Sequence, residues 1–245
     1  MGQAGHLGTA GDSSDDDSSS EDRRVFLLGF DADGRVVIAR NNPDHARYLV
    51  IVIPGVGAWP SGLDPLLLRA EVLCRELSSD PDDDAVSVIT WVDYKTPRSP
   101  GDARDPAFAA EGALRLARFI VGRRVGAEAW GRRSGPQRIT VIGHGYGGLV
   151  AGFAARDHGM DIDALVLLGS ASAGTETVSG LRLPGPVYAT SPEVNGDGTP
   201  YDVHGPRPDS PGFGATVLHP GPLSYGGDPT VRYLSSLKKI ILGTA

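Results

Sequence analysis

The residues best placed for chemistry lie in a glycine-rich turn in the middle of the chain, within RITVIGHGYGGLVAGFAA (Arg138 to Ala155). An apolar run, a tight turn and a second run of small apolar residues predict a β-strand that passes directly into a helix. The turn follows the pattern G-x-S-x-G, which holds a nucleophilic serine at a strand-to-helix corner, but its central residue is Gly145. Nucleophilic catalysis by a hydroxyl at this corner is therefore excluded.

Backbone N–H groups at the same turn retain a chemical role that needs no side chain. In such turns the N–H after the nucleophile, here that of Tyr146, and one from the loop after an earlier strand stabilise a developing oxyanion. The loop PGVGAWP at 54–60 is placed to supply the second donor. A glycine at the corner lets a carboxylate or enolate oxygen approach N–H groups at a helix start. The expected substrate-binding residues are Val56, Gly57, Trp59, Gly145, Tyr146, Gly147 and Tyr225.

Strand-like and helix-like segments alternate along the chain and would position this turn. A hairpin is expected around Asp33 and Gly34. Continuous apolar runs predict buried strands at 48–57, 85–94, 138–143, 162–172 and 185–194. Helices are expected at 63–77, 107–124, 147–156 and 229–243. This order predicts an α/β fold with a mostly parallel sheet, helices on both faces, and a ligand crevice at the carboxyl ends of the strands.

Length and composition limit the classes of function. We expect residues 1–22, which include GDSSDDDSSSED, to be a disordered acidic tail, and residues 23–245 to form one domain. The net charge of −7 disfavours nucleic acid and anionic membranes as partners, which leaves a small-molecule ligand. No signal peptide or membrane span is apparent, and the lone Cys74 suits a reducing cytoplasm. The six scattered histidines predict no metal site, and no cofactor is expected.

Six segments occur in an order that resembles an actinobacterial family of α/β-hydrolases of unassigned function. They are IPGVGAWP, ITWVDYKTP, VIGHGYGGLVAGFAA, LVLLGSASAG, VYATSPEV and VHGPRPDSPGFGATVL. The family shows a P-G-T-G loop, a G-H-S-Y-G elbow and a late H-G-x-x-P…F-G-A segment. The resemblance extends from about Phe26 to Gly243 and implies an α/β-hydrolase fold with a Ser–Asp–His triad.

The chain departs from this family at two of the three triad positions. Gly145 stands at the serine position, and the histidine position falls near Pro222 or Leu223. A triad acts as a unit, so a chain without its serine and histidine loses most of the rate enhancement. The acid implied by the resemblance is Glu193, with Asp197 and Asp202 as alternatives.

Three other residues could restore part of a hydrolase site. His219 lies a few residues before the expected histidine and could be a displaced base, although it has no nucleophile to activate. Ser170 or Ser172, at the end of the next strand, could be a shifted nucleophile, but serine there is commonly a turn residue.

Two functional hypotheses of different class follow, with a third in reserve. In the first, the protein is a non-hydrolytic catalyst such as a cyclase, isomerase or dehydratase, which polarises a substrate carbonyl and moves a proton. In the second it is a catalytically inactive relative that binds a ligand or serves as a scaffold, and in the third an esterase inactivated by mutation. The expected catalytic residues are Glu193, Asp93, Tyr94 and Tyr146, with His144 and His219 as further candidates.

Overall fold

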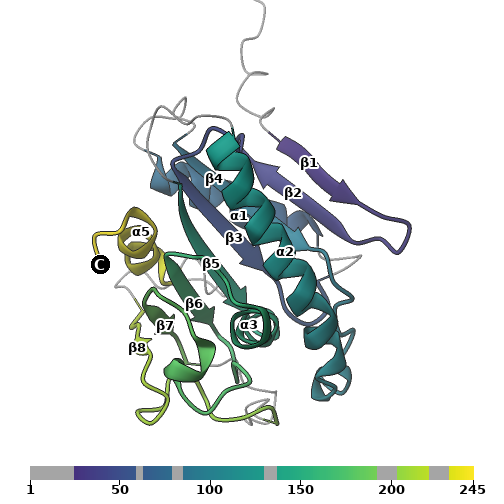
Figure 1. The fold of residues 1–245 in the computed structure, drawn as a ribbon, viewed down its shortest axis with the longest axis vertical. Helices are drawn as coiled ribbons and strands as arrows, with labels where there is room; N and C mark the ends of the chain where they lie inside the picture. Colours follow the sequence, from purple (N-terminus) through teal and green to yellow (C-terminus); the bar gives the residue numbers. More distant parts are fainter. Residues whose placement is uncertain (1–24, 59–62, 79–84, 130–136, 192–202, 221–231) are drawn as a thin grey trace, which may run out of the picture.

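A computed structural model describes residues 25–58, 63–78, 85–129, 137–191, 203–220 and 232–245. The predicted acidic tail at 1–22 lies outside these ranges. The described strands form one sheet in the order β1-β2-β4-β3-β5-β6-β7-β8 (Figure 1). The strands are β1 (Val25–Phe30), β2 (Val36–Arg40), β3 (Tyr48–Ile53), β4 (Val86–Val92), β5 (Arg138–His144), β6 (Ala164–Leu168), β7 (Val187–Ala189) and β8 (Thr216–Val217).

The sheet is parallel from β4 to β8 and antiparallel only at its β1 end. β1 pairs with β2, and β2 with β4, in antiparallel register, whereas β4, β3, β5, β6, β7 and β8 pair in parallel. The central strands β3 to β6 are buried along almost their whole length, as their continuous apolar sequences predict. The prediction of a mostly parallel sheet is therefore confirmed.

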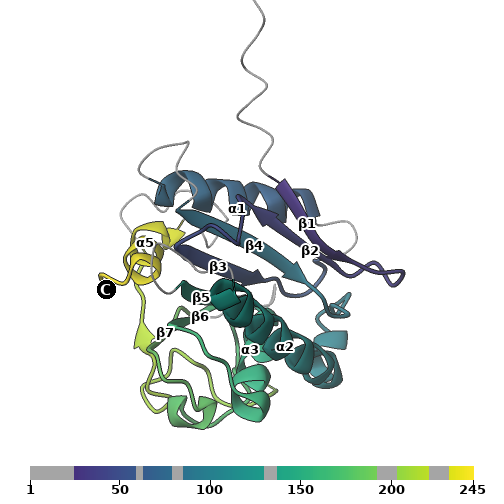
Figure 2. The same ribbon diagram turned by 45° about the horizontal axis from the view of Figure 1, so that its top comes forward.

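Helices cover both faces of this sheet (Figure 2). One face packs against α1 (Leu63–Leu77) and α5 (Leu234–Leu242), in a core that includes Leu73, Val88 and Leu237. The other face packs against α2 (Ala107–Ala129) and α3 (Gly147–Phe153), in a core that includes Leu116 and Val150. The predicted two-faced arrangement is confirmed, and the fold is that of the α/β-hydrolases.

Some element boundaries differ from those expected. α2 extends five residues beyond the predicted end at Arg124; the last three, AEA, are good helix formers, and no proline interrupts the helix. α3 passes into a π-helical turn at Ala154–His158, and Gly159, with φ 73°, ends it. The two-residue strand β8 has no counterpart in the prediction because it is too short to produce a periodic pattern.

The turn between β5 and α3 requires glycine at its flanks for reasons of space. A Cβ on Gly143 would lie 2.6 Å from the Cα of Gly148, and one on Gly147 would lie 2.9 Å from the carbonyl oxygen of Pro54. Both distances are shorter than real Cβ contacts, so only glycine fits. The close approach of β3, β5 and α3 thereby fixes the position of Gly145 between them.

Candidate functional site

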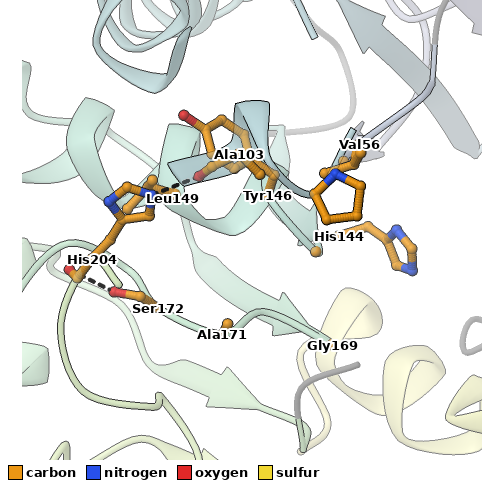
Figure 3. Close-up of a pocket in the computed structure, with 12 residues that line it drawn as sticks. Val56, Ala103, His144, Tyr146, Leu149, Gly169, Ala171, Ser172 and His204 are labelled. Carbon is orange, nitrogen blue, oxygen red and sulfur yellow. Dashed lines mark hydrogen bonds between the residues drawn. The ribbon is translucent and has the colours of Figure 1, made fainter. Parts of the chain in front are cut away.

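A pocket of about 180 Å³ lies beside Gly145, at the carboxyl ends of the parallel strands (Figure 3). Its walls come from the segments that follow β3, β4, β5 and β6, which is where the alternating topology predicts a ligand crevice. Most of the exposed lining is apolar. The lining residues are Gly55, Val56, Pro100, Ala103, His144, Gly145, Tyr146, Leu149, Gly169, Ala171, Ser172 and His204.

Gly145 occupies the sharp corner at the bottom of this pocket. Its φ of 53° lies in the left-handed region, which glycine adopts without the steric cost that other residues carry. A Cβ built on Gly145 would have only the Cα of Gly55 within 4 Å, at 4.0 Å. The corner therefore has the backbone of a nucleophile turn, and the space for a nucleophile's side chain is open.

The loop after β3 approaches this corner closely through Gly55. A Cβ on Gly55 would lie 3.0 Å from the amide nitrogen of Tyr146 and 2.9 Å from the carbonyl oxygen of His144. The next residue, Val56, lines the pocket and is 38% exposed. The N–H of Tyr146 belongs to the first turn of α3, where N–H groups lack intrahelical acceptors. This arrangement suits a pocket for a carbonyl or carboxylate oxygen.

The side chain of Tyr146 is fixed by two hydrogen bonds on the side of α2. Its hydroxyl donates to the carbonyl oxygen of Asp105 at 2.6 Å and accepts from the N–H of Ala109 at 3.3 Å. Burial raises the pKa of Tyr146 to about 12, so the phenol stays protonated at neutral pH. Because its one proton is already donated to Asp105, Tyr146 contributes to the pocket its ring and its backbone N–H.

His204 is the titratable side chain that the late segment VHGPRP brings to the pocket. Its Nε2 lies 2.7 Å from the carbonyl oxygen of Ala103. A carbonyl can only accept, so Nε2 carries a proton and Nδ1 of the neutral ring keeps its lone pair. The imidazole meets the ring of Tyr146 edge-on, with centroids 6.2 Å apart. In Figure 3 the ring of His144 points away from His204, so the two imidazoles do not face each other.

Residues 31–194 match the sequence model of an alpha/beta hydrolase family. This range includes β2 to β7 and the whole Gly145 corner. This chain belongs to that alpha/beta hydrolase family. Two strains of Mycobacterium tuberculosis each have an uncharacterized protein that is 31% identical over 158 residues. The match covers 59% of this chain and 23% of each relative, so the chain spans about a quarter of the length of these relatives.

Solved structures of hydrolases are similar to the chain at low sequence identity. A hyperthermophilic esterase from the archaeon Pyrobaculum calidifontis is 22% identical, with a TM-score of 0.42 over 64% of this chain and 49% of the esterase. A dienelactone hydrolase from Anabaena variabilis is 20% identical, with a TM-score of 0.37 over 68% of this chain and 71% of that protein.

Two of the expected catalytic residues of this family member lie outside the pocket and have structural contacts. The carboxylate of Asp93 accepts from Arg115 at 2.5 Å, and Arg115 also donates to the carbonyl oxygen of Asp93. The hydroxyl of Tyr94 donates to the carbonyl oxygen of Pro54 at 2.6 Å, and its side chain is fully buried. Both side chains therefore anchor the strand ends that support the pocket, and neither lines it.

The two serines considered as shifted nucleophiles are also engaged. The Ser172 hydroxyl lines the pocket, donates to the carbonyl oxygen of His204 at 2.9 Å and accepts from the N–H of Gly174 at 3.0 Å. The buried hydroxyl of Ser170 donates to the carbonyl oxygen of Gly143 at 3.1 Å. Each proton is held by a backbone carbonyl, so these serines stabilise the loop after β6.

The remaining expected residues divide into three groups. Val56, Gly145 and Tyr146 line the pocket as expected. The N–H of Gly57 donates to the carbonyl oxygen of Pro97 at 2.8 Å, and neither Gly57 nor Gly147 lines this pocket, so their assignment to substrate stays a prediction. His219 is exposed beyond β8, away from the pocket. Outside the described residues lie Trp59, Glu193, Asp197, Asp202, Pro222, Leu223 and Tyr225.

Sequence reasoning missed His204 as a pocket residue. The signal was present in the late H-G-x-x-P segment, but the histidine lies 59 positions after Gly145 and its approach depends on an irregular loop. Within the ranges that the structure describes, no three metal-ligating side chains gather, and no helix is long and apolar enough to cross a bilayer.

Proposed function

We propose that this family member is a non-hydrolytic catalyst, of the cyclase, isomerase or dehydratase type, that acts on a small carbonyl compound. The observation that carries the proposal is the glycine at the corner. The space that a nucleophile's side chain would fill is open there and belongs to the pocket. The pocket is lined by Tyr146 at the start of α3, and we assign its backbone N–H to the substrate oxygen. Because no hydroxyl stands at Gly145, and those of Ser170 and Ser172 are engaged, acyl transfer is disfavoured.

The substrate oxygen would bind at the N–H of Tyr146, with Val56 and the loop after β3 beside it. Polarisation of a carbonyl by fixed N–H donors in an apolar pocket stabilises the negative charge that develops on oxygen during enolisation. The negative charge on the substrate oxygen is then stabilised by hydrogen bonds alone, without a covalent bond between substrate and protein. This step is common to isomerisation, dehydration and cyclisation at a carbon next to a carbonyl.

His204 is the group we assign to proton transfer in the described part of the pocket. Its Nε2–H bond to Ala103 fixes the ring and leaves Nδ1 as the basic atom. An imidazole can both accept and return a proton, which is the role we assign to His204. Glu193, the acid expected after β7, remains a proposed second proton carrier.

The test combines an esterase assay with product analysis. Purified protein is incubated with p-nitrophenyl acetate and butyrate, for which we expect hydrolysis at the background rate. It is then incubated with a bacterial metabolite extract, and mass spectrometry follows each compound. We expect one carbonyl compound to convert to an isomer or to a product that has lost water, and we expect His204→Gln to abolish this conversion. Esterase activity well above background would contradict the proposal.

A second candidate function is ligand binding without turnover. It is favoured by one observation, namely that the described lining contains no carboxylate and holds its tyrosine and serine hydroxyls in structural hydrogen bonds. Under this alternative a small molecule co-purifies with the protein and is recovered unchanged. Filling the corner with Gly145→Leu would release it, whereas His204→Gln would retain it.

A further inference from the structure

The outer edge of the sheet carries an apolar surface that no described element covers. β1 is the last strand at this edge, and its sequence VFLLGF is exposed along nearly its whole length. Leu27 is 66% exposed and Phe30 68%. Large apolar side chains are seldom exposed in a contiguous group on a monomeric protein, so this edge requires an explanation.

The register of β1 against β2 determines the face on which these side chains lie. Leu27 is paired with Ile38, and Phe30 with Val36. Directly paired residues of antiparallel strands point to the same face, and Val36 and Ile38 pack toward α1. Leu27 and Phe30 therefore lie on the α1 side, on the face that Figure 2 shows along the upper side of the sheet.

A groove of about 320 Å³ runs between β1 and α1 on this face. Its lining includes Val25, Ile38, Leu67 and Leu68. Val25 is 51% exposed and Leu68 61%. Leu27 and Phe30 do not line this cavity but lie on the same face of β1. We refer to the cavity and these two residues together (Val25, Leu27, Phe30, Ile38, Leu67 and Leu68) as the β1–α1 groove.

The area of the β1–α1 groove matches what self-association requires. The four most exposed side chains present roughly 450 Å² of apolar surface, within the range of about 300–600 Å² for the largest patch on a monomer, which is often functional. Two copies packed face to face would bury about 900 Å² of apolar surface, and the polar rim would raise the total to about 1,200 Å², the lower end for a specific interface.

Charges at the rim are also compatible with a two-fold arrangement. Arg40 lies at one end of the groove, while Asp64 and Glu71 lie on the α1 side. In an isologous interface each patch meets its own copy, so a self-complementary surface must carry both signs of charge. A groove with one sign of charge would instead repel its copy.

We propose that the β1–α1 groove is the interface of a symmetric homodimer. The two copies contact each other through side chains, and the sheet does not continue across the interface. The reason is the register shift between Leu27 and Gly29, a β-bulge that interrupts the hydrogen-bonding edge of β1. Edge bulges disfavour the addition of a further strand, whereas they leave side-chain packing on one face unaffected. This proposal is independent of the reaction at the Gly145 pocket.

Light scattering coupled to size-exclusion chromatography tests the dimer on the full chain, over about 5–200 µM protein. We expect a dimer for the unmodified protein, and a monomer with unchanged circular dichroism for Leu27→Glu combined with Phe30→Glu. The matched control is Val121→Glu, since Val121 is 60% exposed on α2, which packs on the face of the sheet opposite α1. A monomeric unmodified protein, or a dimer that survives the double substitution, would overturn the proposal.

Salt and a crosslink distinguish side-chain packing from other contacts. Because the interface is mainly apolar, the dimer fraction should not decrease between 0.15 and 0.5 M NaCl, whereas an interface held by rim charges would weaken. The single Cys74 is buried, so Leu27→Cys introduces one surface thiol per copy. We expect mild oxidation to link Leu27→Cys into covalent dimers at least tenfold faster than Val121→Cys. Equal rates for the two variants would overturn the placement of the interface.

Discussion

Gly145→Ser tests the backbone geometry of the corner and its chemistry in one protein. The structure places Gly145 at φ 53°, where a residue with a Cβ costs about 1–2 kcal/mol relative to glycine. No clash adds to this cost, since the nearest atom to the new Cβ is the Cα of Gly55 at 4.0 Å. Serine also lowers the conformational entropy of the unfolded chain relative to glycine, which offsets about 0.5 kcal/mol of this cost. The net destabilisation is therefore about 1 kcal/mol.

For a chain of this size, about 1 kcal/mol corresponds to a fall in Tm of about 2–4 °C. Differential scanning calorimetry measures this fall against two glycine controls. Gly122→Ala, in the exposed middle of α2 with no atom within 4 Å of its Cβ, should be stabilising by about 0.5–1 kcal/mol. Gly143→Ala would force a Cβ to 2.6 Å from the Cα of Gly148, so it should destabilise by more than about 3 kcal/mol.

The same Gly145→Ser protein should hydrolyse p-nitrophenyl esters at background rates. The histidine position of the triad falls near Pro222 or Leu223, and a serine without the base of its triad gains little reactivity. A Tm equal to or above that of the unmodified protein would contradict the left-handed backbone conformation of Gly145. A fall in Tm as large as that of Gly143→Ala would contradict the open space around a Cβ at position 145. Strong esterase activity would show that another base, such as His204, can activate a serine at position 145, and would refute this expectation.

Three further predictions concern the residues that support the pocket. Tyr94→Phe removes the hydrogen bond to Pro54 and leaves a buried carbonyl without its donor, so denaturant unfolding should show a loss of about 1–3 kcal/mol. Burial raises the pKa of the Tyr94 and Tyr146 phenols, so above about pH 10 the unfolded chain releases protons that the folded chain retains. Stability that is complete below this pH should therefore decrease as pH rises, and a stability that does not change between pH 9 and 11 would contradict this. Asp93→Asn weakens a partly exposed ion pair with Arg115, so it should cost less than about 1 kcal/mol, with the difference shrinking in 1 M salt and any turnover retained.

The fold was predictable because its signals are local. The β-branched run at Tyr48–Ile53 and the apolar run at Ala164–Leu168 are each readable without knowledge of their neighbours, and alternation with helices implies the parallel sheet. The corner was readable for the same reason, since close backbone contacts require the glycines at 143 and 147 whatever the rest of the chain does. The pocket at the strand ends then follows from topology.

The roles of individual side chains were less predictable because each depends on a partner distant in sequence. Asp93 follows a strand end, as a catalytic acid would, but Arg115 on α2 binds it. Tyr94 similarly finds its acceptor 40 positions away, at Pro54. Sequence position located both residues near the strand ends, yet it did not indicate whether they face the pocket or the supporting structure.

By itself, the sequence determined the class of fold, the position of the strand-to-helix corner and the absence of a hydroxyl there, since local patterns of residue size and backbone freedom specify all three. Only the tertiary structure decided that His204 reaches the pocket, that Ser172 and Tyr146 are held by backbone carbonyls, and that no other element of the described ranges covers β1. These outcomes depend on which distant segments meet once the sheet has formed. Side-chain contacts between such segments are set by packing, and packing has no periodic signature in the chain.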